Sequence, residues 1–424
     1  LALCCGMAAE TVEISTPHTS LVLDATKGQE LKQLYYGDRL TAADLAGLND
    51  AGGAQHAAYP VYGTICQGET ALAVRHTDGN LSLQMEVTGV SKKAEGNATV
   101  TTVSMKDKVY PLRVDVCYKT YADADVIETW TEISHEEKGT VTLNQFASGY
   151  LPIRRGTVWL SSLYGAWANE AQVAQELLEP GMKVIKNKDG LRNSHTAHAE
   201  VMFSLDGRPR ENSGAVIGAA LCYGGNYKLR IDTDESEYHH FFAGINEENS
   251  AYNLPKGEVF RTPALALTYS QEGLSGASRN FHKWGRKHRL MHGDKERMIL
   301  LNSWEGVYFN INQEGMAQMM QDIARMGGEL FVMDDGWFGS KYQRNSDNAA
   351  LGDWTVDSRK LPEGIDGLLR DAKKNGVKFG IWIEPEATNT TSELYEKHPE
   401  WIINAPKREP ATGRGGTQLM LDLG

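Results

Sequence analysis

Three short segments combine carboxylates with amide or aromatic side chains, and each one directly follows an apolar run. They are Asn302-Ser303-Trp304-Glu305, Asp334-Asp335-Gly336-Trp337 and Glu384-Pro385-Glu386. The adjacent carboxylates Asp334 and Asp335 repel each other and need hydrogen-bond donors, which sugar hydroxyls can supply. Because successive side chains of a strand alternate in direction, only one of the two is expected to face a pocket squarely. An Asp-Asp-Gly sequence is also typical of a turn or a metal site, and spacing alone leaves this alternative open.

Tryptophans accompany these carboxylates. The four that lie at or near the same segments are Trp304, Trp337, Trp354 and Trp382. A flat aromatic ring can stack on the apolar face of a pyranose ring, while a few polar groups bind its hydroxyls. The combination of tryptophans and carboxylates predicts a carbohydrate pocket.

The elements that must carry these residues alternate between strand and helix. Apolar runs at 298–301, 330–333 and 379–383 predict buried strands, and helices ending near Gly327 and Gly376 are expected between them. Such repeats favour a (β/α) barrel, in which functional residues gather at the carboxyl ends of the strands. The segment 298–424 has about half the length of a complete barrel of roughly 250 residues. We therefore expect the first part of a (β/α)8 TIM barrel or, as the alternative, a smaller doubly wound sheet.

The first half of the chain has a different period. From Val12 to Thr268, apolar residues recur at every second position in short runs separated by turn residues, as in the run 81–87, and this predicts an antiparallel β-sandwich. The stretch Ser275–Met291 predicts a joining helix. The expected organisation is a signal-peptide remnant at 1–9, a sandwich domain at 10–272, a linker helix at 273–297 and the barrel portion at 298–424.

Composition excludes several classes of protein. The chain has 424 residues, a net charge of −12 and a pI near 5.5, which argues against binding to a nucleic-acid backbone as its main task. No apolar window is long enough to predict a membrane span. The spacing of the five cysteines (Cys4, Cys5, Cys66, Cys117 and Cys222) indicates buried free thiols rather than a disulfide framework. His239-His240 is expected to be a surface pair rather than a metal site, and the sequons at Asn80, Asn97 and Asn389 carry no weight.

The N-terminus predicts export. Leu1–Ala9 is apolar, lacks an initiator Met and is followed by polar residues, as at the end of a signal peptide. Leu3 precedes Cys4, which disfavours a lipid anchor. We therefore expect a periplasmic or extracellular protein, the alternative being a fragment boundary that falls on a few apolar residues.

The strand-end segments resemble glycoside hydrolase family 36, the microbial and plant α-galactosidases. The matching segments of the second half are Asn302–Glu305, Leu330–Gly339, Leu351–Trp354, Arg359–Pro362, Gly380–Glu386, Leu394–Tyr395, His398–Trp401 and Gln418–Leu423. Looser matches to the family's β-supersandwich domain are Tyr59–Thr64, His76–Asn80 and Tyr269–Ser275. The resemblance covers most of the chain and implies an N-terminal antiparallel β-supersandwich followed by a (β/α)8 barrel.

The resemblance also implies roles for individual residues. Asp334 and Asp335 match the pair that receives galactose hydroxyls, and Trp304 and Trp382 match aromatic residues of the pocket. Glu384 and Glu386 are expected to have structural roles. The family has an arginine just before the last matching strand, where this chain has Gly416, and Arg414 is the nearest substitute.

The family's nucleophile, an Asp in a Lys-Trp-Asp motif, and its acid/base Asp are not found up to Gly424. A retaining glycosidase needs two carboxyls about 5 to 5.5 Å apart. We therefore expect the N-terminal part of a longer retaining exo-α-galactosidase, inactive alone, with its catalytic residues beyond Gly424. It would act on galactose-containing oligosaccharides without cofactor or metal, as a possible homo-oligomer. The alternatives are an α-N-acetylgalactosaminidase or galactosyltransferase of the same family and a noncatalytic sugar-binding protein.

Overall fold

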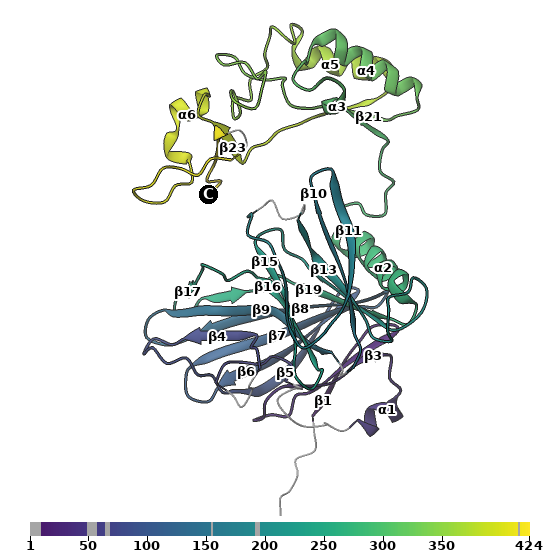
Figure 1. The fold of residues 1–424 in the computed structure, drawn as a ribbon, viewed down its shortest axis with the longest axis vertical. Helices are drawn as coiled ribbons and strands as arrows, with labels where there is room; N and C mark the ends of the chain where they lie inside the picture. The colour runs from purple at the N-terminus through teal and green to yellow at the C-terminus, as the bar shows by residue number, and fades with distance from the viewer. Residues whose placement is uncertain (1–9, 49–56, 64–67, 154–155, 191–195, 414–415) are drawn as a thin grey trace, which may run out of the picture. The chain divides into compact units, whose positions relative to one another are not determined.

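The computed structural model describes residues 10–48, 57–63, 68–153, 156–190, 196–413 and 416–424. The chain forms two compact units, Leu1–Asp294 and Lys295–Gly424 (Figure 1). The predicted signal remnant at 1–9 and the candidate Arg414 lie outside the described residues, as do Cys4, Cys5 and Cys66. Of the cysteines that are described, Cys117 is a buried free thiol and Cys222 is a half-buried one.

The strands of the first unit pair antiparallel throughout its described part. One sheet has the order β1 (Thr11–Ser15), β2 (Thr19–Asp24) and β3 (Lys32–Asp38), and the short helix α1 (Ala42–Gly47) follows it. A ten-stranded sheet has the order β11 (Asn169–Leu177), β10 (Trp159–Ala166), β13 (Ala197–Ser204), β14 (Val216–Leu221), β19 (Leu265–Ser270), β8 (Ala124–His135), β7 (Leu112–Tyr121), β6 (Ala98–Asp107) and β5 (Met85–Glu95), with β18 (Val259–Arg261) on β8. A six-stranded sheet has the order β12 (Gly181–Lys186), β15 (Tyr227–Thr233), β16 (His239–Ile245), β9 (Val141–Ile153) and β17 (Tyr252–Leu254), with β4 (Leu72–Arg75) on β9.

Alternating apolar side chains fill the interior of this unit. One buried cluster includes Val103, Leu112 and Ile133, and a second includes Phe203 and Phe241. The predicted antiparallel sandwich is therefore confirmed. The run 81–87 differs in one respect: strand β5 begins only at Met85, and Leu81 is exposed. The cause is Asn80, whose Oδ1 accepts hydrogen bonds from the Leu81 and Ser82 N–H groups and so holds the start of this run outside the strand.

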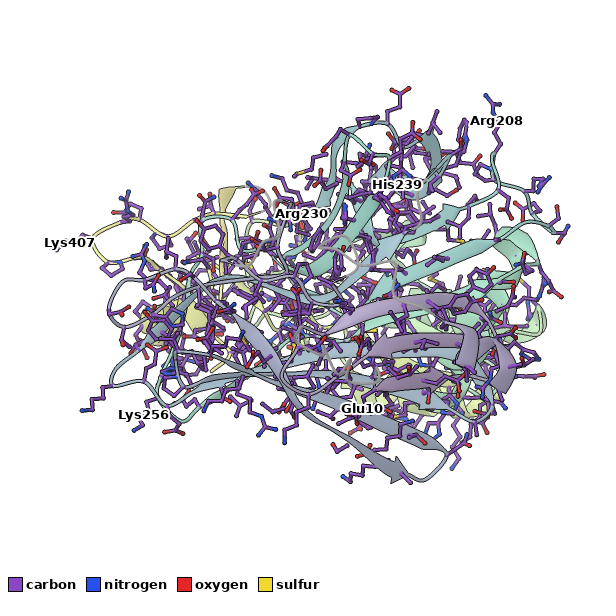
Figure 2. The ribbon with its side chains drawn as sticks, turned by 90° about the horizontal axis from the view of Figure 1, so that it is seen from below. Glu10, Arg208, Arg230, His239, Lys256 and Lys407 are labelled. Carbon is purple, nitrogen blue, oxygen red and sulfur yellow. The ribbon has the colours of Figure 1, made fainter. Side chains whose placement is uncertain are left out.

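The prediction that His239-His240 forms a surface pair is wrong. His239 is buried on β16, where its Nδ1 lies 2.9 Å from Thr233 Oγ1 and its Nε2 lies 2.8 Å from the Gly156 carbonyl oxygen. Burial lowers the pKa of His239. Arg230 is likewise buried on the neighbouring strand β15, and both residues are labelled in Figure 2. The pair lies inside a sheet because β15 and β9 flank β16 on its two sides.

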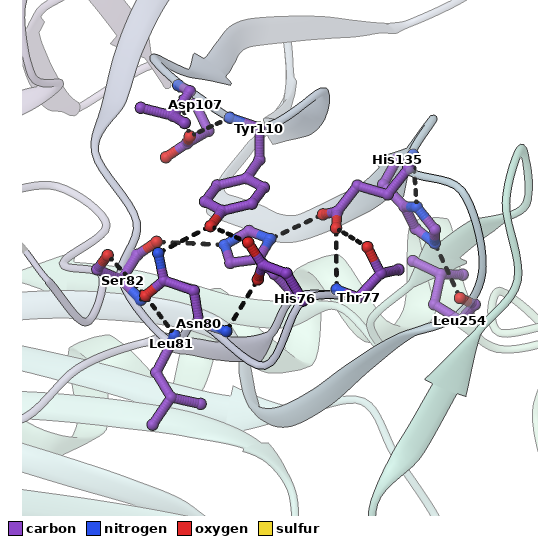
Figure 3. Close-up of polar contacts among 12 residues, drawn as sticks. His76, Thr77, Asn80, Leu81, Ser82, Asp107, Tyr110, His135 and Leu254 are labelled. Atoms are coloured by element: carbon purple, nitrogen blue, oxygen red, sulfur yellow. Dashed lines mark hydrogen bonds and ion pairs between the residues drawn. The ribbon is translucent and has the colours of Figure 1, made fainter.

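A buried imidazole–carboxylate pair anchors the loop after β4. His76 Nδ1 lies 2.7 Å from Glu137 Oε1, and its Nε2 lies 3.2 Å from the Ser82 carbonyl oxygen (Figure 3). The other Glu137 oxygen accepts hydrogen bonds from the Thr77 N–H and hydroxyl groups. The Tyr110 ring stacks on His76 with the ring centroids 3.6 Å apart. Because both imidazole nitrogens face oxygen acceptors, His76 has no nucleophile to activate, and the network is structural.

The joining helix is divided in two. Helix α2 covers Gly273–Trp284, and a π-helical turn at Gly285–Arg289 continues it, so the predicted helix at 275–291 is α-helical only in its first part. Trp284 Nε1 donates a hydrogen bond of 2.9 Å to Glu128 of β8, and His288 Nε2 lies 2.8 Å from Asp123 Oδ1. These contacts hold the joining segment against the ten-stranded sheet.

The second unit alternates strand and helix. Strands β20 (Leu300–Asn302), β21 (Leu330–Met333) and β22 (Lys378–Ile381) are parallel, and β23 (Ala387–Asn389) pairs antiparallel with β24 (Gln418–Met420). The helices are α3 (Trp304–Val307), α4 (Gln313–Arg325), α5 (Gly364–Asn375) and α6 (Glu393–Lys397), with a 3-10 turn at Pro399–Trp401. Within the described part of the chain, no helix has the length and apolar character that a membrane span requires.

Local sequence explains the two long helices of this unit. Asn312 caps α4 by accepting a hydrogen bond of 2.8 Å from the Gly315 N–H, and Gly376 ends α5 in the left-handed conformation. Met316 and Met320 of α4 and Leu368 of α5 are buried with Phe331 of β21 in one apolar cluster. Met316 and Met320 are therefore part of the core of this unit.

Candidate active site

The three strand-end segments meet because β20, β21 and β22 are parallel neighbours. Leu300 pairs with Leu330, and Val332 pairs with Gly380, so their carboxyl ends lie along one edge of the sheet. The backbone hydrogen bonds between these strands continue past the strand ends. The Ser303 N–H donates to the Val332 carbonyl oxygen, and the Trp382 N–H donates to the Met333 carbonyl oxygen.

Asp334 is the first residue after β21 and is held by groups from β20. Its N–H donates to Ser303 Oγ at 3.0 Å, and its Oδ2 accepts a hydrogen bond of 2.6 Å from Asn302 Nδ2. Its Oδ1 accepts from the Asp335 N–H at 2.7 Å. The residue is 9% exposed. Each carboxylate oxygen thus receives one protein donor and keeps further lone pairs for a ligand.

Asp335 has a different environment. Arg344 Nε and Nη2 donate to its two oxygens at 2.8 and 2.7 Å, and both side chains are almost fully buried. Burial raises the pKa of Asp335, and Arg344 opposes this increase. We expected sugar hydroxyls to supply the donors for this carboxylate, but the structure supplies them from the protein. The two carboxylates therefore have separate partners.

Arg344 was not predicted as a site residue. Its Nη1 donates to Asn389 Oδ1 at 3.1 Å and to the Ala349 carbonyl oxygen at 3.0 Å, and its guanidinium lies near the faces of Phe309 and Phe338. The residue lies in an irregular polar loop that has no periodic pattern. A lone arginine in such a loop carries no sequence signal that separates it from a solvated one.

Lys360 fixes the loops around this ion pair. Its Nζ donates to the carbonyl oxygens of Phe309, Gly336 and Arg344 at 2.9, 2.8 and 2.9 Å, and burial lowers the pKa of Lys360. Lys360 lies in the matching segment Arg359–Pro362, but no role was predicted for it. The ammonium group connects three segments that are separate in the sequence.

The four tryptophans do not form one wall. Trp337, Trp354 and Trp382 pack together with Phe338, and Trp337 is buried with its Nε1 donating to the Trp382 carbonyl oxygen at 3.0 Å. Trp304 belongs to α3 and packs edge-on against Tyr308 and Phe309. Trp337 is therefore a core residue. Trp304 and Trp382 are half-buried at the strand ends, which leaves part of each accessible.

The remaining expected residues have supporting positions or lie outside the described part. Glu384 Oε1 accepts a hydrogen bond of 2.5 Å from Gln418 Nε2, consistent with a structural role. Gly416 has a φ of 71°, a left-handed conformation that glycine adopts without strain. Arg414 is not described. Within the described residues, no cluster of three or more His, Cys, Asp or Glu side chains could hold a metal ion.

Comparisons with known proteins cover both units. The model of the glycosyl hydrolase family 36 N-terminal domain matches residues 29–255, and the melibiase model matches residues 259–424. α-Galactosidase Mel36A of Lactobacillus acidophilus is 34% identical over 335 residues, which cover 78% of this chain and 45% of the relative. α-Galactosidase C of Emericella nidulans is 33% identical over 338 residues, which cover 77% and 44%. The chain spans about half the length of such relatives.

Solved structures agree with these matches. The α-galactosidase AgaA of Geobacillus stearothermophilus has a TM-score of 0.89 at 27% identity, covering 97% of this chain and 61% of that one. The α-galactosidase of Lactobacillus brevis has a TM-score of 0.88 at 29% identity, covering 98% and 60%. These similarities support an N-terminal sandwich followed by the start of a catalytic barrel, and the chain belongs to glycosyl hydrolase family 36.

Proposed function

We propose that this chain is part of a retaining exo-α-galactosidase that releases terminal α-linked galactose from oligosaccharides. The main supporting observation is the pair of carboxylates after β21, one bonded to Asn302 and the other to Arg344, in a chain whose relatives are α-galactosidases. Variants of one relative, AgaA of Geobacillus stearothermophilus, were solved in complex with raffinose and with stachyose, which supports galactose-containing oligosaccharides as the substrate class.

In this proposal each candidate has a binding role. Asp334 accepts hydrogen bonds from galactose hydroxyls through its remaining lone pairs. Asp335 accepts a further hydroxyl while Arg344 keeps it ionised and oriented. Trp304 and Trp382 contact the apolar face of the sugar, and Arg414 is a further candidate contact. The charge-assisted hydrogen bonds give orientation, and the rings exclude water.

Neither carboxylate suits the covalent chemistry. A nucleophile must direct a free oxygen at the anomeric carbon, and an acid must hold a proton for the leaving oxygen. Arg344 binds both oxygens of Asp335, and Asn302 and the Asp335 N–H bind those of Asp334. These contacts suit both carboxylates to binding. Because the family's Lys-Trp-Asp motif is not found in residues 1–424, we also propose that the reacting carboxyls are not among these residues and that this chain alone has no hydrolytic activity.

The test compares two proteins on two substrates. The complete product of the gene and the 424-residue chain are assayed with p-nitrophenyl α-galactoside, and with the α-N-acetylgalactosaminide as control. We expect the complete product alone to cleave the galactoside. Turnover by the 424-residue chain would contradict its proposed inactivity. If the complete product prefers the N-acetylated substrate, the sugar assignment is wrong, and if it cleaves neither, the noncatalytic alternative is supported.

Export is a further part of the proposal and rests on the sequence of Leu1–Ala9. Cell fractionation with an antibody against the protein tests it: we expect the periplasmic or extracellular fraction, and a cytosolic location would contradict export.

A further inference from the structure

The first unit contains a cavity of about 660 Å³ that the proposed function does not use. It is bordered by β3, by the end of β9 and by residues around β14 and β19. This volume is within the usual range of roughly 300 to 1,000 Å³ for small-molecule sites. Its lining combines apolar side chains such as Ile153 and Ile217 with polar ones from β3 and from the residues that follow β19. The cavity thus offers both apolar surface and hydrogen-bonding groups.

Tyr35 provides a fixed aromatic ring at this cavity. Its hydroxyl donates a hydrogen bond of 3.0 Å to the Asp38 carbonyl oxygen. The ring lies against Gly37: a Cβ atom there would be 2.6 Å from Tyr35 Oη and 2.9 Å from its Cζ. A side chain at position 37 would therefore displace the Tyr35 ring, whereas glycine leaves it in place. Such a ring can stack on the apolar face of a sugar without first being ordered.

The polar side chains at the cavity are either held by hydrogen bonds within the protein or available to bind a ligand. Gln271 Nε2 donates to Asp38 Oδ2 at 2.8 Å and to Tyr269 Oη at 2.6 Å, which orients the Asp38 carboxylate and leaves it further acceptor capacity. The side-chain amide of Gln33 has no partner among the described residues, although it lines the same cavity. An amide and a carboxylate together can donate to and accept from vicinal hydroxyl groups.

The charge of the lining restricts the ligand. Among the described residues that border the cavity, Asp38 is the one charged group. Among these described lining residues, a phosphate or carboxylate ligand would meet an acidic group and no cation. A ligand with many hydroxyls and no charge fits the stacking ring, the free amide and the carboxylate.

We propose that this cavity binds one or two sugar units of a neutral oligosaccharide, as a carbohydrate site carried by the sandwich. The site goes beyond the proposed hydrolysis, because it uses no residue of the strand-end site and requires no reaction. Its effect would be to retain an oligosaccharide on the protein and so raise its local concentration.

The test measures raffinose binding to the 424-residue chain by saturation-transfer NMR and calorimetry. Asp334→Asn is introduced first, so that the strand-end site is weakened and its contribution is separated. We expect raffinose binding to persist in this variant. Adding Tyr35→Ala should weaken it at least about fivefold, through loss of the stacking surface, and adding Gln33→Ala should weaken it about threefold, through loss of one hydrogen bond.

Tyr164→Ala is the matched control, because Tyr164 is an exposed tyrosine of β10 that does not line the cavity. It should leave the affinity unchanged. Gln33→Ala guards against misfolding, because the Gln33 side chain has no hydrogen-bond partner among the described residues to lose. The proposal is overturned if Asp334→Asn removes all raffinose binding, or if both cavity variants bind like the control. Either result leaves the proposed hydrolysis intact, since that is decided by turnover of the galactoside.

Discussion

Buried charged groups in the two units are paired in similar ways but in different surroundings. In the sandwich, Glu137 is bonded to His76 and Thr77 and fixes a loop beside antiparallel strands. In the second unit, Asp335 is bonded to Arg344 directly beyond a parallel strand and next to Asp334. Antiparallel neighbours end on opposite sides, whereas parallel strands bring their carboxyl ends to one edge. The comparison indicates that strand direction, more than the type of ion pair, determines where polar groups converge.

The two units also differ in how their sheets are covered. Large apolar side chains of the sandwich lie between sheets, as Phe203 and Phe241 do. In the second unit Phe331 and Met333 of β21 are fully buried, but Leu300 is 50% exposed and Ile381 is 39% exposed. The parallel sheet of the second unit therefore has uncovered apolar positions.

The largest effect is expected when the units are separated. Residues 10–294 should fold alone and unfold cooperatively, because both sandwich cores lie within them. Residues 295–424 should bind the dye ANS and self-associate, because apolar strand residues are exposed. Size-exclusion chromatography and thermal denaturation of the two pieces check this. If residues 295–424 are monomeric and unfold cooperatively, the two units do not differ in how well their sheets are covered.

Removing the partner of the buried carboxylate should have the next largest effect. Arg344→Met leaves Asp335 buried and unpaired, so we expect a loss of about 3 to 5 kcal/mol in the free energy of unfolding and loss of galactose binding. Arg370→Met is the control, because Arg370 pairs with Glu363 and both side chains are exposed. It should cost less than about 1 kcal/mol. Urea denaturation followed by tryptophan fluorescence measures both, and equal losses would contradict the role of burial.

The sequence motifs predicted well which segments lie side by side, because the pairing of parallel strands alone determines this. The segments that carry Asp334, Trp304 and Trp382 were expected at strand ends, and parallel pairing brings them to one edge. The contacts made by those side chains were not predictable to the same extent. Trp337 has the same residue type and spacing as the others, yet its ring is buried. Side-chain direction after the last strand residue depends on loop packing, which no local pattern encodes.

Residues that act from irregular loops escaped prediction. Arg344 and Lys360 are positioned by long-range contacts, with Asn389 and with the Phe309 carbonyl oxygen among others. In the sandwich, His239 was misassigned because two adjacent histidines appear polar, although the His239 side chain is buried in the folded unit. These errors share one cause: tertiary burial determines the environment of a polar residue, and local sequence does not report it.

Replacing the loop-binding lysine should have a moderate effect. Lys360→Met leaves the carbonyl oxygens of Phe309, Gly336 and Arg344 without their common donor, and we expect a loss of about 2 to 3 kcal/mol in the free energy of unfolding. Lys341→Met is the control, because Lys341 pairs with Glu396 on the surface. Chemical denaturation compares them. If both variants lose the same free energy of unfolding, the three hydrogen bonds from Lys360 to carbonyl oxygens stabilise the protein no more than a surface ion pair does.

The smallest effect concerns acid stability of the sandwich. Burial would raise the pKa of Glu137, but hydrogen bonds from His76 and Thr77 lower it below its usual value of 4.5. Ionised Glu137 therefore stabilises the native state above about pH 4.5, and this contribution disappears as the pH falls through the lower native pKa.

Glu137→Gln should remove this dependence and cost about 1 to 2 kcal/mol near neutral pH. Glu136→Gln is the neighbouring control, since that side chain is mostly exposed. Melting temperatures of residues 10–294 between pH 6 and pH 3 give the measurement. If the melting temperature of Glu137→Gln falls between pH 6 and pH 3 as steeply as that of the unsubstituted protein, other carboxyl groups cause the pH dependence.

The position of Asn389 has a practical consequence for producing the protein. Asn389-Thr390-Thr391 is a glycosylation sequon, and its asparagine is fully buried. The Nδ2 atom, to which a glycan would be attached, donates to the Asp347 carbonyl oxygen at 2.9 Å, while Oδ1 accepts from Arg344. A secretory pathway that modifies nascent chains would add a bulky sugar before this residue could pack. A bacterial host avoids this modification, whereas a yeast secretion system requires Thr391→Ala to remove the acceptor sequence.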